Sequence, residues 1–577
     1  MMSILKNSLL AIVALLMVPA CCQGIKVERW RVAELSFCSD KDYARSSGED
    51  LVLDVVFVHK ATGTKLVRPA FWDGGHVFRV RFAPTETGRW QWHTACAQDP
   101  SLDGRKGALR CVKYKGNLDI YRHGFVTADT GRKYMTYADG TPFFYLGDTH
   151  WGMYTEEIDE PGPHAGNTGA GSHFKYIVDK RVEQGFTVCQ SEPIGSKFNL
   201  ADGHIDDGDI EGFREADRYY QYIADAGLVH ANAEFFFVAQ MNMDFMKDDA
   251  AVLKRLSRYW VARFGAYPVM WTLAQEADND FYRERGDHWN YDRQTNPWVT
   301  VAECLHGCDC YAHPLSAHQE NAIFTTVTGY GTCPGFEHEW GTESAFLSDE
   351  VARRTGHNWW AAQYSPSLTR TPADHPLRDY WQSPRPAVDY EGRYCYLWTK
   401  DLGERAQGWI AFLTGFCGYG YGAVDMWLYQ STYDIDTTSD DGKEKITPED
   451  KAVYWCDALE LESARQMAYL KDFLTSFEWW TLTPVFEDDK EFIPENDAAF
   501  SYAYMPEGKH VLYFFGEDVT TGTITQLPAS KAVSLTWMNP RTGEYGEPQS
   551  ASTTAEGTLV LPHKPDTNDW VLIAQVE

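Results

Sequence analysis

The spacing of apolar and polar residues changes twice along the chain and divides it into three segments. From about Ile25 to Leu118, short runs such as DLVLDVVFVH and HVFRVRFAP alternate apolar with polar positions, and Gly, Pro and Asp residues separate them. A similar texture returns near the C-terminus in AAFSYAYMPEGKHVLYFFGED. Short alternating runs between turn residues are typical of antiparallel β-sandwiches. We therefore predict one β-sandwich over residues 25–118 and a second over residues 484–577.

The middle segment, residues 119–483, combines short apolar runs with longer stretches at helical spacing. Leu253, Leu256, Trp260 and Phe264 share one helical face, and an apolar run begins shortly after them. Such runs are found at residues 142–148, 185–192, 228–237, 268–274, 315–320, 358–364, 386–391 and 416–427. Parallel strands are apolar on both faces and need long crossovers, so the pattern predicts an α/β fold, a (β/α)8 TIM barrel flanked by the two β-sandwiches. An open doubly wound sheet is the alternative, although no Gly-rich phosphate loop follows the first run.

The first 21 residues have the features of an export signal. Lys6 supplies a positive charge, and the apolar core SLLAIVALLMV that follows is short for a membrane span. The tetrapeptide VPAC, ending at Cys21, resembles the bacterial lipobox, in which the cysteine is lipidated and becomes the mature N-terminus. Ordinary signal cleavage nearby is the alternative. We predict an exported lipoprotein of the cell envelope that meets the membrane only through a lipid on Cys21.

The amino-acid composition limits the kinds of molecule that the chain is expected to bind. The formal net charge of -30 opposes a polyanionic partner, so we expect no nucleic acid to bind. The 21 Trp residues are mostly core residues, but large flat side chains beyond core needs often line sites for sugar rings. A carbohydrate substrate fits these features, whereas the oligomeric state is not indicated.

The cysteines do not form a disulfide framework. Of the 13 cysteines, two are Cys21 and Cys22, which leaves eleven without regular spacing. The densest group is Cys304, Cys308 and Cys310 with His313, whose side chains suit zinc but lack the paired C-x-x-C spacing of structural sites. Zinc, a local disulfide and free thiols all stay open for this group, and we predict neither a metal nor another cofactor in the active site.

Polar residues at the ends of the predicted strands are the candidate site residues. In a (β/α)8 barrel, side chains just past the carboxyl ends of the strands converge on one mouth, where active sites lie. The polar residues at these ends are Asp148, His150, Glu192, Gln275, Glu276, His318, Gln363 and Glu391. The aromatic residues beside them that suit substrate binding are Trp151, Tyr390 and Trp427.

Two of the carboxylates have the arrangement that glycoside hydrolysis requires. Glu276 on the fourth strand and Glu391 on the seventh stand on opposite sides of the predicted mouth. One carboxyl group would protonate the leaving oxygen, and the other would attack the anomeric carbon or activate a water, at a separation of about 5 to 5.5 Å or about 6.5 to 9.5 Å respectively. The acid must be kept protonated by an apolar setting or by its negative neighbour, and Trp271 and Tyr390 are candidates for that setting.

For each candidate residue, a purely structural role is the alternative to a role in catalysis or substrate binding. Glu276 has Arg283 and Arg285 as possible ion-pair partners, and Glu391 has Arg393. Alternation alone does not choose between Asp389 and Glu391. Asp148 suits helix capping or loop fixing as well as sugar contact. His150, His318 and Gln363 suit a role in holding the carboxylates, and Trp151 and Trp427 suit packing within the barrel as well as stacking on a sugar.

Four segments together resemble one known family. PFFYLGDTHW resembles the first strand of the apiosidase-like glycoside hydrolases, and WTLAQEAD falls where that family ends its fourth strand on an acidic residue. RPAVDYEGRY is similar to its Pro-x-x-Asp-x-Glu stretch, and GWIAFLTGFCGYGYGAVDMW is similar to its eighth unit. FWDGGHVFRVRFAPTETGRWQW and TWMNPRTGEYG resemble the β-sandwich before these barrels and the collagen-binding-like sandwich after them.

The resemblance implies a retaining glycosidase with Glu276 as acid/base and Glu391 as nucleophile. One position departs from the family pattern, which has Gly-Asp where this chain has Gln275-Glu276. The pair is closer to the Asn-Glu of the wider group of retaining barrel glycosidases, which implies that Gln275 contacts the hydroxyl next to the anomeric carbon. The departure argues against apiose as the specific sugar.

We therefore expect a glycoside hydrolase that cleaves O-glycosidic bonds of a complex polysaccharide or oligosaccharide, such as those of plant cell walls. One alternative is a non-catalytic glycan-binding lipoprotein on a barrel scaffold. Another is a metal-dependent hydrolase that uses the Cys304 to His313 group. Glycan binding that survives loss of either Glu276 or Glu391 would favour the first alternative, and bound zinc the second.

Overall fold

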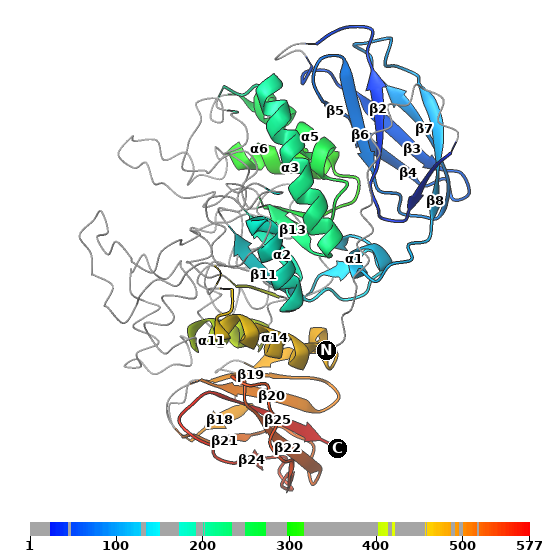
Figure 1. Ribbon diagram of the computed structural model, residues 1–577. Helices are drawn as coiled ribbons and strands as arrows, with labels where there is room; N and C mark the ends of the chain where they lie inside the picture. The colour runs from blue at the N-terminus through cyan, green and yellow to red at the C-terminus, as the bar shows by residue number, and fades with distance from the viewer. Residues whose placement is uncertain are drawn as a thin grey trace, which may run out of the picture.

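The computed structural model describes residues 24–43, 48–128, 134–150, 158, 172–191, 200, 202–232, 249–272, 297–316, 402–413, 418–421, 456, 459–485, 491–495, 500–515 and 519–577. Figure 1 shows three successive parts: β strands near the N-terminus, a central part with helices and a parallel sheet, and β strands near the C-terminus. We call them the N-terminal β unit (residues 25–112), the central part (residues 119–481) and the C-terminal β unit (residues 483–576). The described residues thus form a mixed α/β fold.

Two sheets form the N-terminal β unit. One has five strands in the order β1-β8-β7-β3-β4, and the other has three in the order β2-β6-β5. All neighbours are antiparallel except β1 and β8. The strands are β1 (Ile25–Glu28), β2 (Ala33–Cys38), β3 (Asp54–His59), β4 (Lys65–Pro69), β5 (Phe71–Trp72), β6 (Val77–Phe82), β7 (Gly88–Ala95) and β8 (Lys106–Val112).

The alternation seen in the sequence gives each of these sheets one buried face. In β2 the residues Ala33, Leu35 and Phe37 are buried, and those between them are exposed. The buried faces meet through aromatic rings: Phe57 of β3 stacks on Phe82 of β6 with ring centroids 3.8 Å apart. The predicted period of two is therefore confirmed at this end of the chain.

The central part contains a six-stranded parallel sheet in the order β15-β14-β13-β12-β11-β16. Its strands are β11 (Tyr145–His150), β12 (Val188–Ser191), β13 (Val229–Asn232), β14 (Val269–Thr272), β15 (Leu315–Ser316) and β16 (Gly418–Tyr421). Five of these strands fall within the runs predicted as strands two to five and eight, and β11 overlaps the first run and extends two residues beyond it. The runs at 358–364 and 386–391 lie outside the described residues. A short hairpin, β9 (Val126–Thr127) and β10 (Thr136–Tyr137), precedes the sheet.

Helices connect and cover these parallel strands. They are α1 (Asp119–Arg122), α2 (His173–Glu183), α3 (Asp207–Ala226), α5 (Ala250–Phe264), α6 (Pro297–Cys308), α11 (Leu402–Leu413), α14 (Glu462–Thr475) and the 3-10 helix η6 (Trp479–Thr481). Each of the first long helices has a polar cap, since the side chains of Ser172, Asp206 and Asp249 accept hydrogen bonds from the first turns of α2, α3 and α5. None of the helices that the structure describes is both long enough and apolar enough to cross a bilayer.

The predicted helical face at residues 253–264 is confirmed in α5. Leu253, Leu256, Trp260 and Phe264 are all buried. Trp260 and Phe264 pack against Phe213 of α3, with centroid distances of 5.9 and 6.4 Å. The spacing of three and four residues therefore places one apolar stripe between two neighbouring helices.

The C-terminal β unit again has two sheets, with strand orders β17-β19-β20-β25-β22-β23 and β18-β21-β24. Its strands are β17 (Thr483–Val485), β18 (Phe492–Pro494), β19 (Phe500–Tyr504), β20 (Lys509–Phe514), β21 (Gly522–Ile524), β22 (Ala532–Met538), β23 (Gln549–Ser552), β24 (Leu559–Val560) and β25 (Trp570–Val576). All their pairings are antiparallel. Phe492 of β18 packs on Phe500 of β19 with centroids 4.7 Å apart, which joins the two layers.

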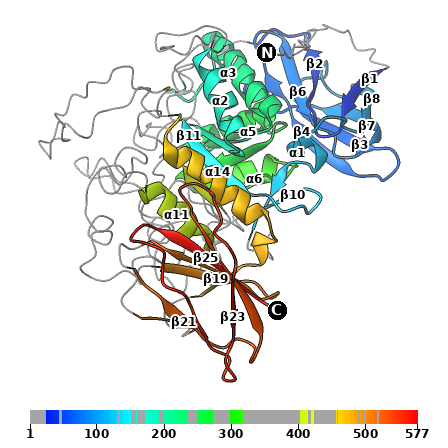
Figure 2. The same cartoon turned by 60° about the horizontal axis from the view of Figure 1, so that its bottom comes forward.

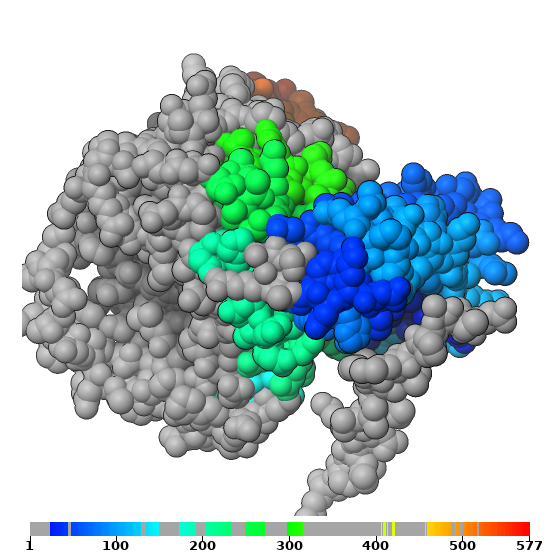
Figure 3. All heavy atoms as spheres, turned by 90° about the horizontal axis from the view of Figure 1, so that it is seen from above, coloured from blue at the N-terminus to red at the C-terminus, as the bar shows by residue number. Residues whose placement is uncertain are grey.

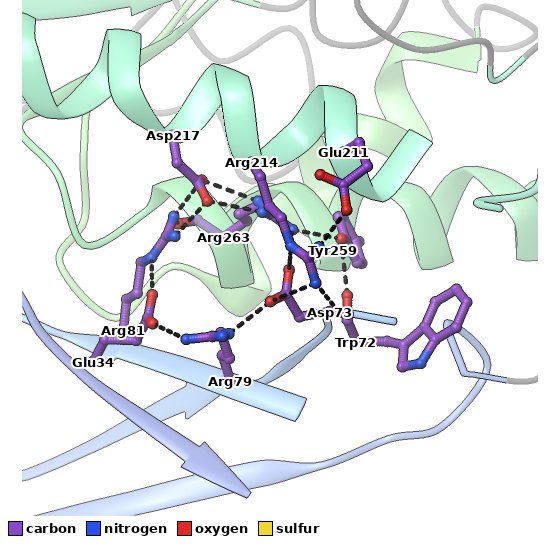
Figure 4. A network of polar contacts seen from close by, with 10 residues as sticks. All are labelled: Glu34, Trp72, Asp73, Arg79, Arg81, Glu211, Arg214, Asp217, Tyr259 and Arg263. Atoms are coloured by element: carbon purple, nitrogen blue, oxygen red, sulfur yellow. Dashed lines mark hydrogen bonds and ion pairs between the residues drawn. The ribbon is translucent and has the colours of Figure 1, made fainter. Parts of the chain in front are cut away.

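A buried ionic network attaches the N-terminal β unit to the central part. Figure 3 shows the N-terminal residues lying directly against α3, α5 and α6, and Figure 4 shows the contacts between them. Arg81 of β6 donates two hydrogen bonds of 2.6 Å to Asp217 of α3, and Arg263 of α5 donates to the same carboxylate at 2.8 and 3.0 Å. Burial raises the pKa of Asp217, but the two guanidinium groups outweigh it and hold the pKa below its usual value. On the β-sheet side, Arg79 donates to Asp73 at 2.6 Å.

A second buried network attaches the C-terminal β unit, which lies next to α11 and α14 in Figure 2. Asp569 precedes β25, and its carboxylate accepts hydrogen bonds from Arg405 of α11 at 2.7 and 2.9 Å. Tyr513 of β20 and Arg541 also donate to this carboxylate, each at 2.9 Å. Both β units are thus held to the central part by carboxylates that have more than one partner.

Candidate active site

The structure describes two of the predicted site residues, Asp148 and His150, which are the fourth and sixth residues of β11. The others lie outside the described residues: Trp151, Glu192, Gln275, Glu276, His318, Gln363, Tyr390, Glu391 and Trp427, together with the predicted lipidation site Cys21. Their assignments stay predictions. The described ends of β11 to β15 nevertheless show how the sheet orients the chain where these residues begin.

The parallel register divides the side chains between two faces of the sheet. Asp148 pairs with Cys189, Cys189 with His230, and His150 with Ser191, so these residues share one face. This face is covered by helices, because Arg181 of α2 hydrogen-bonds to Asp148, and Tyr220 of α3 packs on His230 with ring centroids 4.3 Å apart. We call it the helix-side face. Because side chains alternate along a strand, the residues between these point to the other face.

Asp148 and His150 belong to a buried polar cluster on the helix-side face. Arg181 Nε donates to Asp148 Oδ2 at 2.7 Å, and His150 Nε2 lies 2.5 Å from the same oxygen. Asp148, His150 and Arg181 are each 1% exposed. The Arg181 guanidinium also lies over the rings of Phe186 and Tyr421, 5.1 and 5.2 Å from their centroids. In the described residues Asp148 and His150 thus contact each other and Arg181. A role of His150 in holding the catalytic carboxylates, and contact of either residue with a substrate, stay predictions.

The charges in the cluster compensate one another. Burial raises the pKa of Asp148, but the Arg181 guanidinium and His150 reverse the effect and hold the pKa below its usual value. Asp148 is therefore an anion paired with a cation inside the protein, and removal of one partner from such a pair is strongly destabilising. Arg181 extends the cluster by donating to Gln184 Oε1 at 2.6 Å and to the backbone oxygen of Leu459 at 3.2 Å.

The same cluster has the residue types of a cysteine-based catalytic triad. His150 Nε2 contacts Asp148, and its Nδ1 lies 3.9 Å from Cys189 Sγ. Burial, together with the Asp148 charge, raises the pKa of the Cys189 thiol well above its usual value, so the thiol stays protonated. His230 lies 2.6 Å from Ser191 Oγ, and burial followed by the proximity of His150 lowers the pKa of His230 to about 3. Neither the Cys189–His150 pair nor the Ser191–His230 pair is placed for nucleophilic catalysis, because all four side chains are buried.

Gln190 lies on the other face of the sheet. It is the third residue of β12 and alternates with Cys189 and Ser191, which belong to the helix-side face. Gln190 is 1% exposed, and in the part of the chain that the structure describes neither its Nε2 nor its Oε1 has a hydrogen-bond partner. A buried amide without partners costs free energy, so such a group in a native fold calls for an explanation such as an ordered water or a ligand.

Sequence reasoning missed Arg181, His230 and Gln190. Arg181 carried a signal, because it follows the apolar residues Phe174, Ile177 and Val178 at helical spacing and so lies on the buried side of α2. Gln190 carried a weaker signal, since a single amide interrupts the apolar run before Glu192. The partners of these residues come from distant segments and are not visible in the sequence.

The cysteine and histidine group at the end of α6 and just after it does not converge on a common point. His313 Nδ1 is hydrogen-bonded to Asp309 Oδ2 at 2.8 Å, and its ring packs against Trp271 and Phe125. Cys304 Sγ and Cys308 Sγ lie 3.9 Å apart. Among the residues that the structure describes, no three His, Cys, Asp or Glu side chains are grouped to hold a metal ion. Nothing in this geometry supports the zinc interpretation.

Two family models together match most of the chain. Residues 129–481 match the family model of the apiosidase-like catalytic domain, and residues 26–97 match a domain of unknown function, DUF5060. No curated protein sequence matches the chain. A solved structure from Bacteroides vulgatus, assigned as a candidate glycoside hydrolase, is 17% identical with a TM-score of 0.63 and covers 96% of this chain and 100% of its own.

Two further solved structures show a similar fold. One is named a glycoside hydrolase and has a TM-score of 0.53 at 14% identity, covering 80% of this chain and 98% of its own. The other is a glycoside hydrolase of family 5 from Bacteroides vulgatus, with a TM-score of 0.50 at 14% identity, covering 80% of this chain and 95% of its own. At these identities the likeness shows the fold alone.

Proposed function

Because this chain belongs to the apiosidase-like glycoside hydrolase family, we propose that it cleaves O-glycosidic bonds of a complex polysaccharide, such as one of the plant cell wall, or of its oligosaccharides. The observation that carries the proposal is the match of the family's catalytic domain to residues 129–481, more than half of the 577 residues. The flanking β units would then belong to the same exported protein. We expect the reaction to need no metal or other cofactor.

We propose that the central sheet closes into a (β/α)8 barrel within the segment 119–483, between sandwiches at 25–118 and 484–577. The strand order supports this, because β16, within the predicted eighth strand, is parallel to β11, within the predicted first strand. The other described strands continue the sheet in sequence order from β11 to β15. The runs at 358–364 and 386–391 would supply the remaining two strands between β15 and β16.

Alternation at the end of β12 supports the position of one predicted site residue. Gln190 points away from the helix-side face, and Glu192 follows it by two residues. If the alternation continues over these two residues, the Glu192 carboxyl group points away from the helices, which is the interior in a barrel.

In the proposed mechanism Glu391 attacks the anomeric carbon while Glu276 protonates the leaving oxygen. The glycosidic C–O bond breaks, a covalent glycosyl ester forms on Glu391, and the leaving sugar departs as an alcohol. Glu276, now a carboxylate, takes a proton from water, which attacks the anomeric carbon and releases Glu391. Gln275 would hydrogen-bond to the hydroxyl next to the anomeric carbon. Glu192, His318, Gln363, Trp151, Tyr390 and Trp427 would bind the remainder of the substrate.

The experiment compares wild type, Glu276→Gln and Glu391→Gln for release of reducing sugar from a panel of plant polysaccharides and their oligosaccharides. We expect activity in wild type and a loss of about a thousandfold or more in both variants, because each step needs both carboxylates. Matched melting temperatures would show that the fold is intact. Wild-type turnover retained by Glu276→Gln on a substrate with a poor leaving group would overturn its assignment.

The same experiment distinguishes a glycosidase from the alternative, a non-catalytic glycan-binding protein. A non-catalytic glycan-binding protein would release no sugar from any member of the panel, and all three proteins would bind one glycan with similar affinity. No observation favours that alternative here. Export and lipidation are a separate proposal: metabolic labelling with a fatty acid analogue should mark the wild-type protein and not a Cys21→Ala variant, and labelling of both would contradict it.

A further inference from the structure

A pair of thiols on α6 has a setting that the proposed hydrolysis does not use. Cys304 and Cys308 are four residues apart on this helix, and their sulfur atoms lie 3.9 Å apart. Residues with this spacing face the same side of a helix. Both side chains are partly exposed to solvent and neither forms a disulfide. The two thiols therefore lie side by side at a partly exposed position of α6.

The two thiols have different surroundings, which gives them different roles. Cys304 Sγ lies 3.3 Å from the backbone oxygen of Lys254 on α5 and 3.9 Å from Cys308 Sγ, so its single S–H group has two acceptors within reach. Cys308 is the last residue of α6 and lies near the Arg258 guanidinium of α5. Arg258 also donates to Asp54 Oδ1 of β3 at 2.7 Å. The pair thus lies where α5 and α6 meet the N-terminal β unit.

The side-chain contacts of Cys308 with Cys304 and with Arg258 favour a thiolate at this sulfur. The Cys304 S–H group beside it, followed by the Arg258 charge, lowers the pKa of Cys308 to about 7 against the opposing effects of burial and of Asp54. The neighbouring Cys308 and burial raise the pKa of Cys304 against Arg258 and Lys254. One sulfur is therefore the nucleophile near neutral pH, and the other keeps its proton.

We propose that Cys304 and Cys308 form a modification site for low-molecular-weight disulfides. The Cys308 thiolate attacks one sulfur of the disulfide, so that a mixed disulfide forms and one small thiolate leaves and takes a proton from water. Cys304 then loses its proton and attacks Cys308 Sγ, which breaks the mixed disulfide and releases the second small thiolate. The two cysteines are oxidised to a Cys304–Cys308 disulfide with loss of two hydrogen atoms, and the reagent is reduced to two thiols.

Helix geometry makes this disulfide reversible. The Cβ atoms of residues four apart on a helix are about 5–6 Å apart, whereas a disulfide needs about 3.5–4.5 Å between them. The last turn of α6 must therefore tighten when the bond forms, and strained disulfides are the more readily reduced ones. Gly307, next to Cys308, is exposed, and no heavy atom from elsewhere in the described residues lies within 4 Å of the position that a Cβ would occupy there. This turn therefore has space to move.

The first test treats the full-length protein with oxidised glutathione and maps its peptides by mass spectrometry. We expect the peptide that contains both cysteines to lose two hydrogen atoms and to regain them with a small dithiol. A Cys304→Ser variant should stop at the mixed disulfide on Cys308, and a Cys308→Ser variant should leave Cys304 largely unmodified. A mixed disulfide that persists at Cys308 in wild type, or equal modification of Cys304 without Cys308, would overturn the proposal.

The second test measures the alkylation rate of Cys308 against pH. In wild type the rate should be half-maximal near pH 7, whereas an ordinary thiol reaches that point near pH 8.5. Cys304→Ser keeps a hydrogen-bond donor and should retain the low midpoint, whereas Cys304→Ala removes the donor and should raise it. A midpoint near 8.5 in wild type would overturn the assignment of Cys308 as the thiolate, and the exposed Cys38 reports on reagent quality in the same sample.

Discussion

The buried pair of Arg181 and Asp148 gives the sharpest test of how the central part is held together. Replacing Arg181 with Met keeps most of the volume and the packing on Phe186 and Tyr421 but removes the positive charge. Asp148 would then be a buried carboxylate with only His150 beside it. Breaking a buried ion pair on one side typically costs about 3–5 kcal/mol, so we expect a loss of that size in the free energy of unfolding at pH 7.

The loss in the free energy of unfolding of Arg181→Met should depend on pH, and the direction of this dependence follows from the pKa of Asp148. In wild type the folded-state pKa of Asp148 is below the unfolded value of about 3.9, so its contribution is present above that value and is lost as the pH falls through the folded-state pKa. In Arg181→Met burial dominates and the folded-state pKa rises above the unfolded one. Protonation of Asp148 then favours the folded variant, so the difference from wild type should shrink between pH 7 and pH 5.

The assay is urea unfolding followed by far-ultraviolet circular dichroism at both pH values. Arg122→Met is the matched control, because Arg122 pairs with Asp119 at 3.3 Å with both side chains more than half exposed. Exposed pairs contribute at most about 1 kcal/mol, so the control should stay near wild type. The reasoning is refuted if Arg181→Met loses no more stability than Arg122→Met, or if its loss grows on acidification to pH 5.

Further outcomes are expected at other sites. Gln190→Met should raise the melting temperature, since it removes a buried amide without described partners at a cost of about 1–3 kcal/mol; a lower melting temperature would mean that the amide is satisfied by an ordered ligand or water. Asp569→Asn should lower the melting temperature at pH 7, because it leaves Arg405 buried without its anion, whereas Asp566→Asn at an exposed position should not. Burial raises the pKa of Asp569, but the Arg405 guanidinium outweighs this effect and holds the pKa below its usual value. The difference in melting temperature between wild type and Asp569→Asn should therefore diminish as the pH falls below about 4. Equal melting of the two variants would contradict the role given to Asp569.

Much of the secondary structure follows from local spacing. The apolar stripe at Leu253, Leu256, Trp260 and Phe264 predicts α5, and β12, β13 and β14 fall within the runs read as strands. The residues that follow residues 191, 232 and 272 lie outside the described part of the chain. The family resemblance is also confirmed by the match over residues 129–481. Barrel closure and the domain boundaries stay predictions.

The orientation of the strand-end residues was harder to predict. Alternation shows which residues of β11 share a face, but it does not show which face the helices cover. The sequence predicts Asp148 among the sugar-binding residues because it ends an apolar run, yet the structure pairs its carboxylate with Arg181, which lies 33 residues later on α2. Only the tertiary arrangement brings that guanidinium to the sheet. Glu276 and Glu391 lie outside the described residues, so their roles stay predictions.

The shared carboxylate of Asp217 has a consequence for how such proteins evolve. One acidic side chain on α3 holds an arginine from β6 and another from α5, and the backbone oxygen of Arg263 also accepts a hydrogen bond from Arg81. A substitution of Asp217 removes the carboxylate that the two guanidinium groups share, whereas a substitution of either arginine leaves Asp217 with one cationic partner in place of two. We expect the N-terminal β unit to be inherited together with its own α3 and α5, and transplanting it onto another barrel to require all three residues at once.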